Sequence, residues 1–188
     1  MLKSKKKVIV SLSIILFIVL LAFLIYKSSN YTIKGIENYD EEYCNFSLDE
    51  LGDYEDIYYQ YTKKGSVLFN SSSALIIAEY DDLAFNEQLN AIASKEYQKE
   101  AILFDETKFK LPNTEFCIGG WNFKILKNSE NEYDYPKLIN FIAVNEEKKE
   151  IAYLTFFDYD MDYLCTVDES NDFMSDFIID YFKYDFNA

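Results

Sequence analysis

The sequence predicts an α+β fold: an N-terminal transmembrane helix, then one domain with a mainly antiparallel sheet covered on one face by helices. Three observations support this prediction. Residues 8–26 form an uncharged apolar run, strand-like segments alternate with turns from residue 57 onward, and two later segments space apolar side chains helically. About 160 residues follow the apolar run, which is enough chain for one hydrophobic core.

The first 26 residues have the pattern of a membrane anchor. Residues 1–7 carry four lysines, and residues 8–26 carry no charge. As a helix this run is about 28 Å long, close to the hydrocarbon thickness of a bilayer. A cleaved signal peptide has a shorter apolar core that ends at small residues, whereas Leu24-Ile25-Tyr26 ends this run. The sequence therefore predicts a signal-anchor helix that contacts the lipid bilayer through residues 8–26.

Lysine bias predicts the orientation of this anchor. Four lysines precede the run and Lys27 alone follows it closely, so the basic tail of residues 1–7 is expected in the cytoplasm. The chain is then a single-pass protein of the cell membrane. Residues 27–46 are expected to form a juxtamembrane stalk, either a linker or a loose first strand. Residues 47–188 are expected to form an extracytoplasmic α+β domain.

The start of that domain has two interpretations. Ser47 and Glu50 have the spacing of a capping box, and apolar or aromatic residues follow at roughly helical intervals as far as Tyr61. The tyrosine-rich residues 57–61 equally suit a strand that ends at the turn of residues 63–65. Both alternatives stay open.

From residue 73 onward the pattern is clearer. Residues 74–80 predict a strand, and Asp81 and Asp82 can cap a helix that extends to Tyr97. Further strands are predicted at residues 101–104, 138–144 and 151–164, the last being the longest, with a charged turn at 145–150. Residues 116–126 predict either a hairpin about Gly119-Gly120 or one bulged strand, and residues 171–183 an amphipathic helix.

Missing residue types exclude several functions. The chain has no histidine, and all 18 of its basic residues are lysine. Histidine-dependent hydrolases, zinc metalloproteases and most zinc sites are therefore disfavoured. Without arginine there is no bidentate phosphate clamp, and the five glycines form no phosphate-binding loop.

Charge is strongly asymmetric along the chain. All 33 acidic residues follow the apolar run, whereas five of the 18 lysines lie at or before residue 27, so the remainder carries 13 minus 33, or −20. Such a surface repels nucleic acid and anionic polymers, so no nucleic-acid partner is expected. It could attract a basic protein or divalent cations, or could simply keep the domain soluble.

Three cysteines are too few for a disulfide framework. Cys44, Cys117 and Cys165 are widely spaced, and an odd number leaves at least one thiol unpaired. Cys117 and Cys165 could pair if they lie on neighbouring strands. The alternative is that all three are small apolar side chains in the core.

One acidic segment could bind a cation. Asp158, Asp160, Asp162 and Glu169 stand at the relative positions 1, 3, 5 and 12 that supply oxygen ligands in an EF-hand calcium loop. Position 6, however, is Tyr163 instead of glycine, and the segment before the loop resembles a strand. In strict alternation the three aspartates would share one strand face, so an acidic strand edge explains the pattern too. Calcium is the only cofactor that the sequence suggests.

These observations favour binding over catalysis. We expect the outer domain to be a protein-interaction module with an unidentified protein partner. A divalent-cation-dependent module that uses the acidic segment is the first alternative. The second is a carboxylate-type hydrolase acting on a wall glycan, because two carboxylates at the right separation suffice for that chemistry. No catalytic residue can be named, since 33 acids offer many such pairs.

Overall fold

A computed structural model of the chain describes residues 2–65, 70–99, 102–105, 109–111, 114–127, 138–158, 178–179 and 183–187. The long helix α1 (Leu2–Ser29) precedes a sheet domain, and the second helix is α2 (Asp82–Ala93). Two short 3-10 helices, η1 (Ile36–Asn38) and η2 (Leu48–Leu51), lie before the longer strands. The described residues form nine strands, β1 (Tyr31–Lys34), β2 (Asp56–Gly65), β3 (Asn70–Glu79), β4 (Ile102–Asp105), β5 (Phe109–Leu111), β6 (Glu115–Ile118), β7 (Trp121–Ile125), β8 (Leu138–Asn145) and β9 (Glu150–Asp158).

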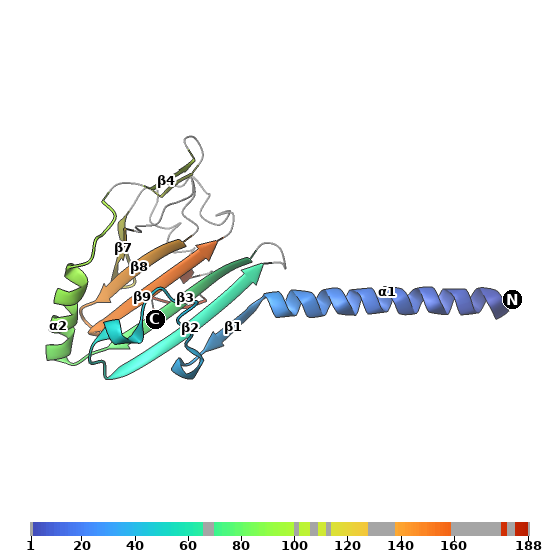
Figure 1. Cartoon of the computed structure of the whole chain (residues 1–188), viewed down its shortest axis with the longest axis horizontal. Coiled ribbons are helices and arrows are strands. Elements are labelled where there is room, and N and C mark those ends of the chain that lie inside the picture. Colours follow the sequence, from blue (N-terminus) through green and yellow to red (C-terminus); the bar gives the residue numbers. More distant parts are fainter. Residues whose placement is uncertain are drawn as a thin grey trace.

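Seven strands form one antiparallel sheet in the order β1-β2-β3-β9-β8-β7-β6, and β4 and β5 form a separate pair (Figure 1). The sheet consists of two meanders, β1 to β3 and β6 to β9. They meet at its centre, where β3 pairs with β9 from Ser71↔Asp158 to Glu79↔Glu150. The predicted α+β class and mainly antiparallel sheet are confirmed.

Both faces of the sheet are covered, so the prediction of helices on one face alone is wrong. The α2-side core contains Phe46, Tyr59, Ile76, Phe85 and Tyr153, and the opposite core contains Leu75, Trp121, Phe141, Leu154 and Phe186. Neighbouring residues of β3 alternate between the two cores because strand side chains alternate in direction. The continuous apolar run of residues 74–78 is typical of a strand buried on both faces. The helical residues Ile178 and Ile179 pack on the face opposite α2.

The hairpin alternative for residues 116–126 is confirmed. Gly119 and Gly120 both have positive φ, which a tight two-residue turn between antiparallel strands requires. A Cβ at Gly119 would also collide with the carbonyl of Phe186. Trp121 and Phe186 meet edge to face at 5.5 Å, so the C-terminal residues close directly over this hairpin.

Helix α1 extends away from the sheet, and α2 lies at the far end of the domain (Figure 1). The side chains of α1 are described from Val10 to Tyr26, and every one of them is exposed. Within the residues that the structure describes, no helix has both the length and the apolar character needed to cross a membrane.

Residues 27–46, expected to be either a linker or a loose first strand, include one strand of the sheet. Residues 31–34 form β1, which pairs with β2, and Cys44 and Phe46 are buried in the α2-side core. Much of the stretch predicted as a stalk therefore belongs to the folded sheet. The sequence signal was weak because β1 is only four residues long and lies at an edge, so most of its side chains remain exposed.

The capping box at Ser47 and Glu50 is confirmed, but the helix that it begins is only the four residues of η2. Residues 57–61 lie in β2, because Tyr59 and Tyr61 point into the α2-side core. Helix α2 ends at Ala93, short of the predicted Tyr97, which forms an isolated bridge with Leu126 instead.

The predictions near the C-terminus are tested only in part. Strand β9 is described to Asp158, and residues 159–164 lie outside the described residues. The longest described strands are β2 and β3, each with ten residues. Of the predicted helix at 171–183, the described residues Ile178 and Ile179 are helical, and Ile178 is buried.

Asp81 caps α2, and its removal should destabilise the domain. Its Oδ1 accepts hydrogen bonds from the amides of Leu83 and Ala84, each at 2.8 Å. We expect Asp81→Ala to lower the free energy of unfolding by about 1 kcal/mol, as loss of an N-cap usually does. Urea denaturation of the full chain measures this, with the exposed Asp53→Ala as the control for loss of a surface charge. Equal stability of the two variants would contradict the prediction.

Candidate functional site

The acidic segment is described only at its first residue. Asp158 is the last residue of β9 and lies opposite Ser71 of β3, whereas Asp160, Asp162 and Glu169 lie outside the described residues. Among the described residues, no three His, Cys, Asp or Glu side chains gather closely enough to hold a metal ion. The calcium site therefore stays a prediction.

A groove lies between α2 and the strands β6, β7 and β8. It has a volume of about 640 Å³. Leu89, Ile92 and Ala93 of α2 line it together with Tyr97, and the sheet contributes residues of β6, β7 and β8 that include Glu115, Cys117, Asn122, Lys124, Ile142 and Val144. The groove belongs to the α2 end of the domain, because Val144 is near the end of β8 that leads into the turn towards β9.

Strand alternation explains the mixed chemistry of the groove. In β6 and β7 every second side chain enters the core on the face opposite α2: Phe116, Ile118, Trp121, Phe123 and Ile125. The side chains between them therefore share the other, open face: Glu115, Cys117, Asn122 and Lys124. The groove thus combines polar groups from β6 and β7 with apolar groups from α2 and β8.

The polar groups of the groove contact one another. The Cys117 thiol donates a hydrogen bond to Oδ1 of Asn122 at 2.9 Å, and these two residues are direct partners in the hairpin. Lys124 lies 3.3 Å from a carboxylate oxygen of Glu115, also its direct partner, and its ammonium lies 5.8 Å from the centre of the Tyr97 ring. Both cross-strand pairs are exposed, so they bring the side chains together on the open face but contribute little to stability.

Tyr97 forms the end wall of the groove. Its hydroxyl donates to the carbonyl of Ile92 at 2.8 Å, which holds the ring against the last turn of α2. Burial raises the pKa of Tyr97 to about 12, so the hydroxyl is neutral at ordinary pH and does not act as a base. A second hollow of about 720 Å³ adjoins the groove at Ala93 and Tyr97, and it is lined by Lys95, Lys99 and Lys127.

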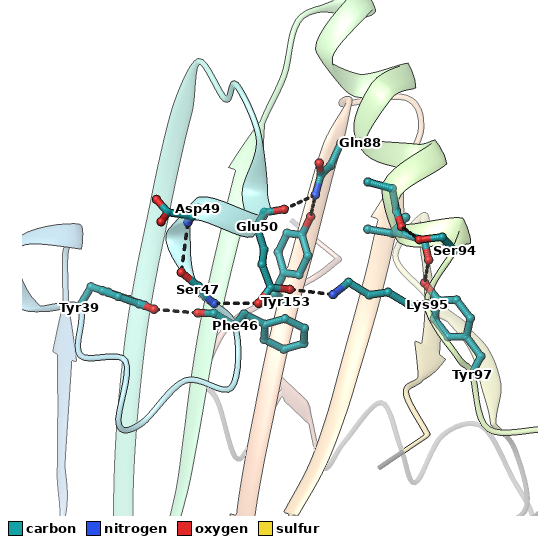
Figure 2. Close-up of polar contacts among 12 residues, drawn as sticks. Tyr39, Phe46, Ser47, Asp49, Glu50, Gln88, Ser94, Lys95, Tyr97 and Tyr153 are labelled. Atoms are coloured by element: carbon teal, nitrogen blue, oxygen red, sulfur yellow. Dashed lines mark hydrogen bonds and ion pairs between the residues drawn. The ribbon is translucent and has the colours of Figure 1, made fainter. Parts of the chain in front are cut away.

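A buried polar network positions α2, the other wall of the groove. Figure 2 shows Gln88 of α2 between η2 and β9: its Nε2 donates to the carbonyl of Glu50 at 2.8 Å and to the hydroxyl of Tyr153 at 2.6 Å. Burial raises the pKa of Tyr153, so its phenol stays neutral. Lys95 adds an ion pair with Glu50 at 2.8 Å, although both side chains are partly exposed and the pair contributes little.

The groove was not predicted from the sequence, although the sequence contains a signal for part of it. Once residues 116–126 are taken as a hairpin, period-two alternation assigns Cys117, Asn122 and Lys124 to one face. The contribution of α2 could not be found in that way, because Leu89 and Ala93 reach the groove only through the packing of the helix on the sheet.

Comparisons with protein-family models, with curated proteins and with solved structures find no match to this chain. The interpretation of the groove therefore rests on its geometry and chemistry.

Gln88 should be essential for holding α2 on the sheet. Replacing it with alanine leaves the Glu50 carbonyl and the Tyr153 hydroxyl without its donor, which should cost about 1–3 kcal/mol of unfolding free energy. The exposed Asn90 on the same helix is the matched control, since Asn90→Ala removes an amide from the surface. Urea denaturation compares the two variants. A Gln88→Ala protein as stable as Asn90→Ala would show that the network does not hold α2.

Proposed function

We propose that this protein is a single-pass protein of the cell membrane whose acidic outer domain binds a partner protein through the groove between α2 and β6–β8. The groove carries this proposal, because it joins an apolar surface to polar side chains, as protein-binding sites do. The partner remains unidentified. A basic partner suits the charge of −20 that follows the apolar run.

Two observations support the membrane anchor. In the sequence the uncharged run covers 19 residues, 8–26, within the length range of transmembrane helices, whereas the side chains that the structure describes in α1 are those of residues 10–26. All described side chains from Val10 to Tyr26 are exposed, and none belongs to either core of the domain. Soluble monomers rarely expose so large an apolar surface, whereas a bilayer would cover it.

Orientation follows from the lysines. The tail of residues 1–7 lies in the cytoplasm and residues 27–188 lie outside the membrane, because lysine-rich flanks are retained on the cytoplasmic side. Since α2 lies at the end of the domain opposite α1, this orientation presents the groove away from the bilayer (Figure 1). A partner outside the membrane could then reach it.

Binding explains the groove better than catalysis. The chain supplies no histidine, and the Cys117 thiol has an asparagine oxygen as its neighbour instead of a base. The Glu115 carboxylate forms an ion pair with Lys124 at 3.3 Å, so its neighbour is a cation and not a second carboxylate. The groove residues therefore suit recognition of another surface.

A charge within the apolar run should release the protein from membranes. We expect Leu16→Asp to lower the membrane-bound fraction sharply, because a carboxylate at the centre of a span costs about 3 kcal/mol. Membrane flotation measures this, and Leu83→Asp is the control because Leu83 is an exposed leucine of α2. Equal flotation of the two variants would contradict the anchor.

The orientation is tested separately. Protease added to intact cells should remove the outer domain, and full protection from protease would contradict the orientation.

A bulky side chain in the groove should prevent partner binding. Ala93 lines the groove and is exposed at the end of α2, so Ala93→Trp fills part of the hollow without disturbing a core. Ala91→Trp is the matched control, because Ala91 is exposed on the same helix but does not line the groove. Crosslinking of the tagged full-length protein in its native membrane measures the captured partner.

The expected result is a partner captured at near-equal stoichiometry by the parent chain and by Ala91→Trp, and lost with Ala93→Trp. A partner that all three proteins retain would place the binding surface elsewhere on the domain. Capture of no partner at all by the parent chain would overturn the proposed interaction role.

A further inference from the structure

The end of the domain that adjoins α1 exposes two tyrosines. Tyr31 of β1 is 38% exposed and Tyr43 is 42% exposed, and both pack against the buried Tyr61 of β2. The Tyr43 and Tyr61 rings stack at 4.5 Å, and the Tyr31 and Tyr61 rings tilt against each other at 6.1 Å. These three residues, which we call the tyrosine cluster, are therefore held in place by the sheet.

Asn30 fixes α1 relative to this cluster. Its side-chain amide donates to the carbonyl of Tyr26 in the helix at 3.0 Å and to the carbonyl of Gly65 at 3.1 Å. The amide of Gly65 donates back to Oδ1 of Asn30 at 3.1 Å. One side chain thus joins the end of the helix to the end of β2. Strand β1 begins at the very next residue, so no long linker separates the helix from the sheet.

This connection determines how far the cluster lies from the apolar run. Tyr31 follows Tyr26 by five residues, which at helical rise is about 7.5 Å along the axis of α1. The headgroup region on each side of a bilayer is about 5–7.5 Å deep beyond the hydrocarbon. If residues 8–26 span the hydrocarbon, Tyr31 lies at headgroup level. Tyr43 lies at the same end, since it lines a hollow with Lys63, Asn70 and Leu138.

We propose that Tyr31 and Tyr43 insert into the phospholipid headgroup layer and hold the α1 end of the sheet against the bilayer surface. This inference rests on the membrane anchor proposed above, and it assigns a second contact with the membrane. Tyrosine suits this position because its ring is apolar and its hydroxyl is polar, and it is enriched at membrane interfaces. Because Asn30 joins the helix to the sheet, the inserted tyrosines limit the tilt of the domain relative to the membrane.

Nearby charged residues limit how deeply the two tyrosines insert and determine which headgroup charge fits them. Glu41 and Glu42 are exposed and directly precede Tyr43, so this turn remains on the water-exposed side of the headgroup layer. Lys63 lies opposite Tyr31 across β1 and β2, where its ammonium can approach lipid phosphates. The two carboxylates disfavour an anionic surface, so the layer that fits best is zwitterionic, as in phosphatidylcholine.

Tryptophan fluorescence in brominated vesicles tests this contact. The full-length Tyr43→Trp variant is reconstituted into phosphatidylcholine vesicles whose acyl chains are brominated close to the headgroups, and into plain vesicles. Trp121 is buried in the core, so the parent chain supplies the baseline emission. Tyr54→Trp is the matched control, because Tyr54 is similarly exposed, at 37%, but precedes β2 at the α2 end of the sheet.

We expect bromine to quench the added emission of Tyr43→Trp and to leave that of Tyr54→Trp unchanged. If the protein floats with the vesicles but the two variants give equal emission in both lipids, the headgroup contact is wrong and the anchor stands. If the protein does not float with the vesicles, both the anchor and this inference are wrong.

Discussion

The pairing of β3 with β9 is the interaction on which the rest of the structure depends. Nine residue pairs join these strands across about 80 positions of sequence, and they unite two meanders into one sheet. Closing so long a loop costs conformational entropy, which burial of both strands must offset. Both strands are apolar on each face, so the pairing creates the two cores at once.

Two-sided burial explains why the groove lies where it does. Helix α2 has only 12 residues, and its middle packs near the centre of the sheet, where Gln88 meets Tyr153. Its last turn therefore reaches β8, and within the described residues the groove lies between this turn and the outer hairpin of β6 and β7. The opposite face of the same hairpin is closed by Phe186. One hairpin thus supplies core on one side and part of the groove on the other.

The domain has two distinct ends because its long strands run between them. Gly65 of β2 and Asn70 of β3 lie beside α1, whereas Glu79 leads into Asp81 and α2. The groove and the tyrosine cluster are consequently separated by the length of the sheet. Under the proposed function, the end beside α1 would face the membrane and the end beside α2 would face a partner.

The sequence by itself determined the elements whose signals are local. The strand at 74–80, the hairpin at Gly119-Gly120, the cap at Asp81 and the uncharged run at 8–26 all follow from periodicity, turn chemistry and charge between near neighbours. Tertiary structure decided what depends on distant residues. It placed β1 in the sheet, ended α2 at Ala93, covered the second face and brought α2 against the hairpin to form the groove. These features depend on which surfaces remain to be buried after the sheet has formed, and no local spacing of residues encodes that.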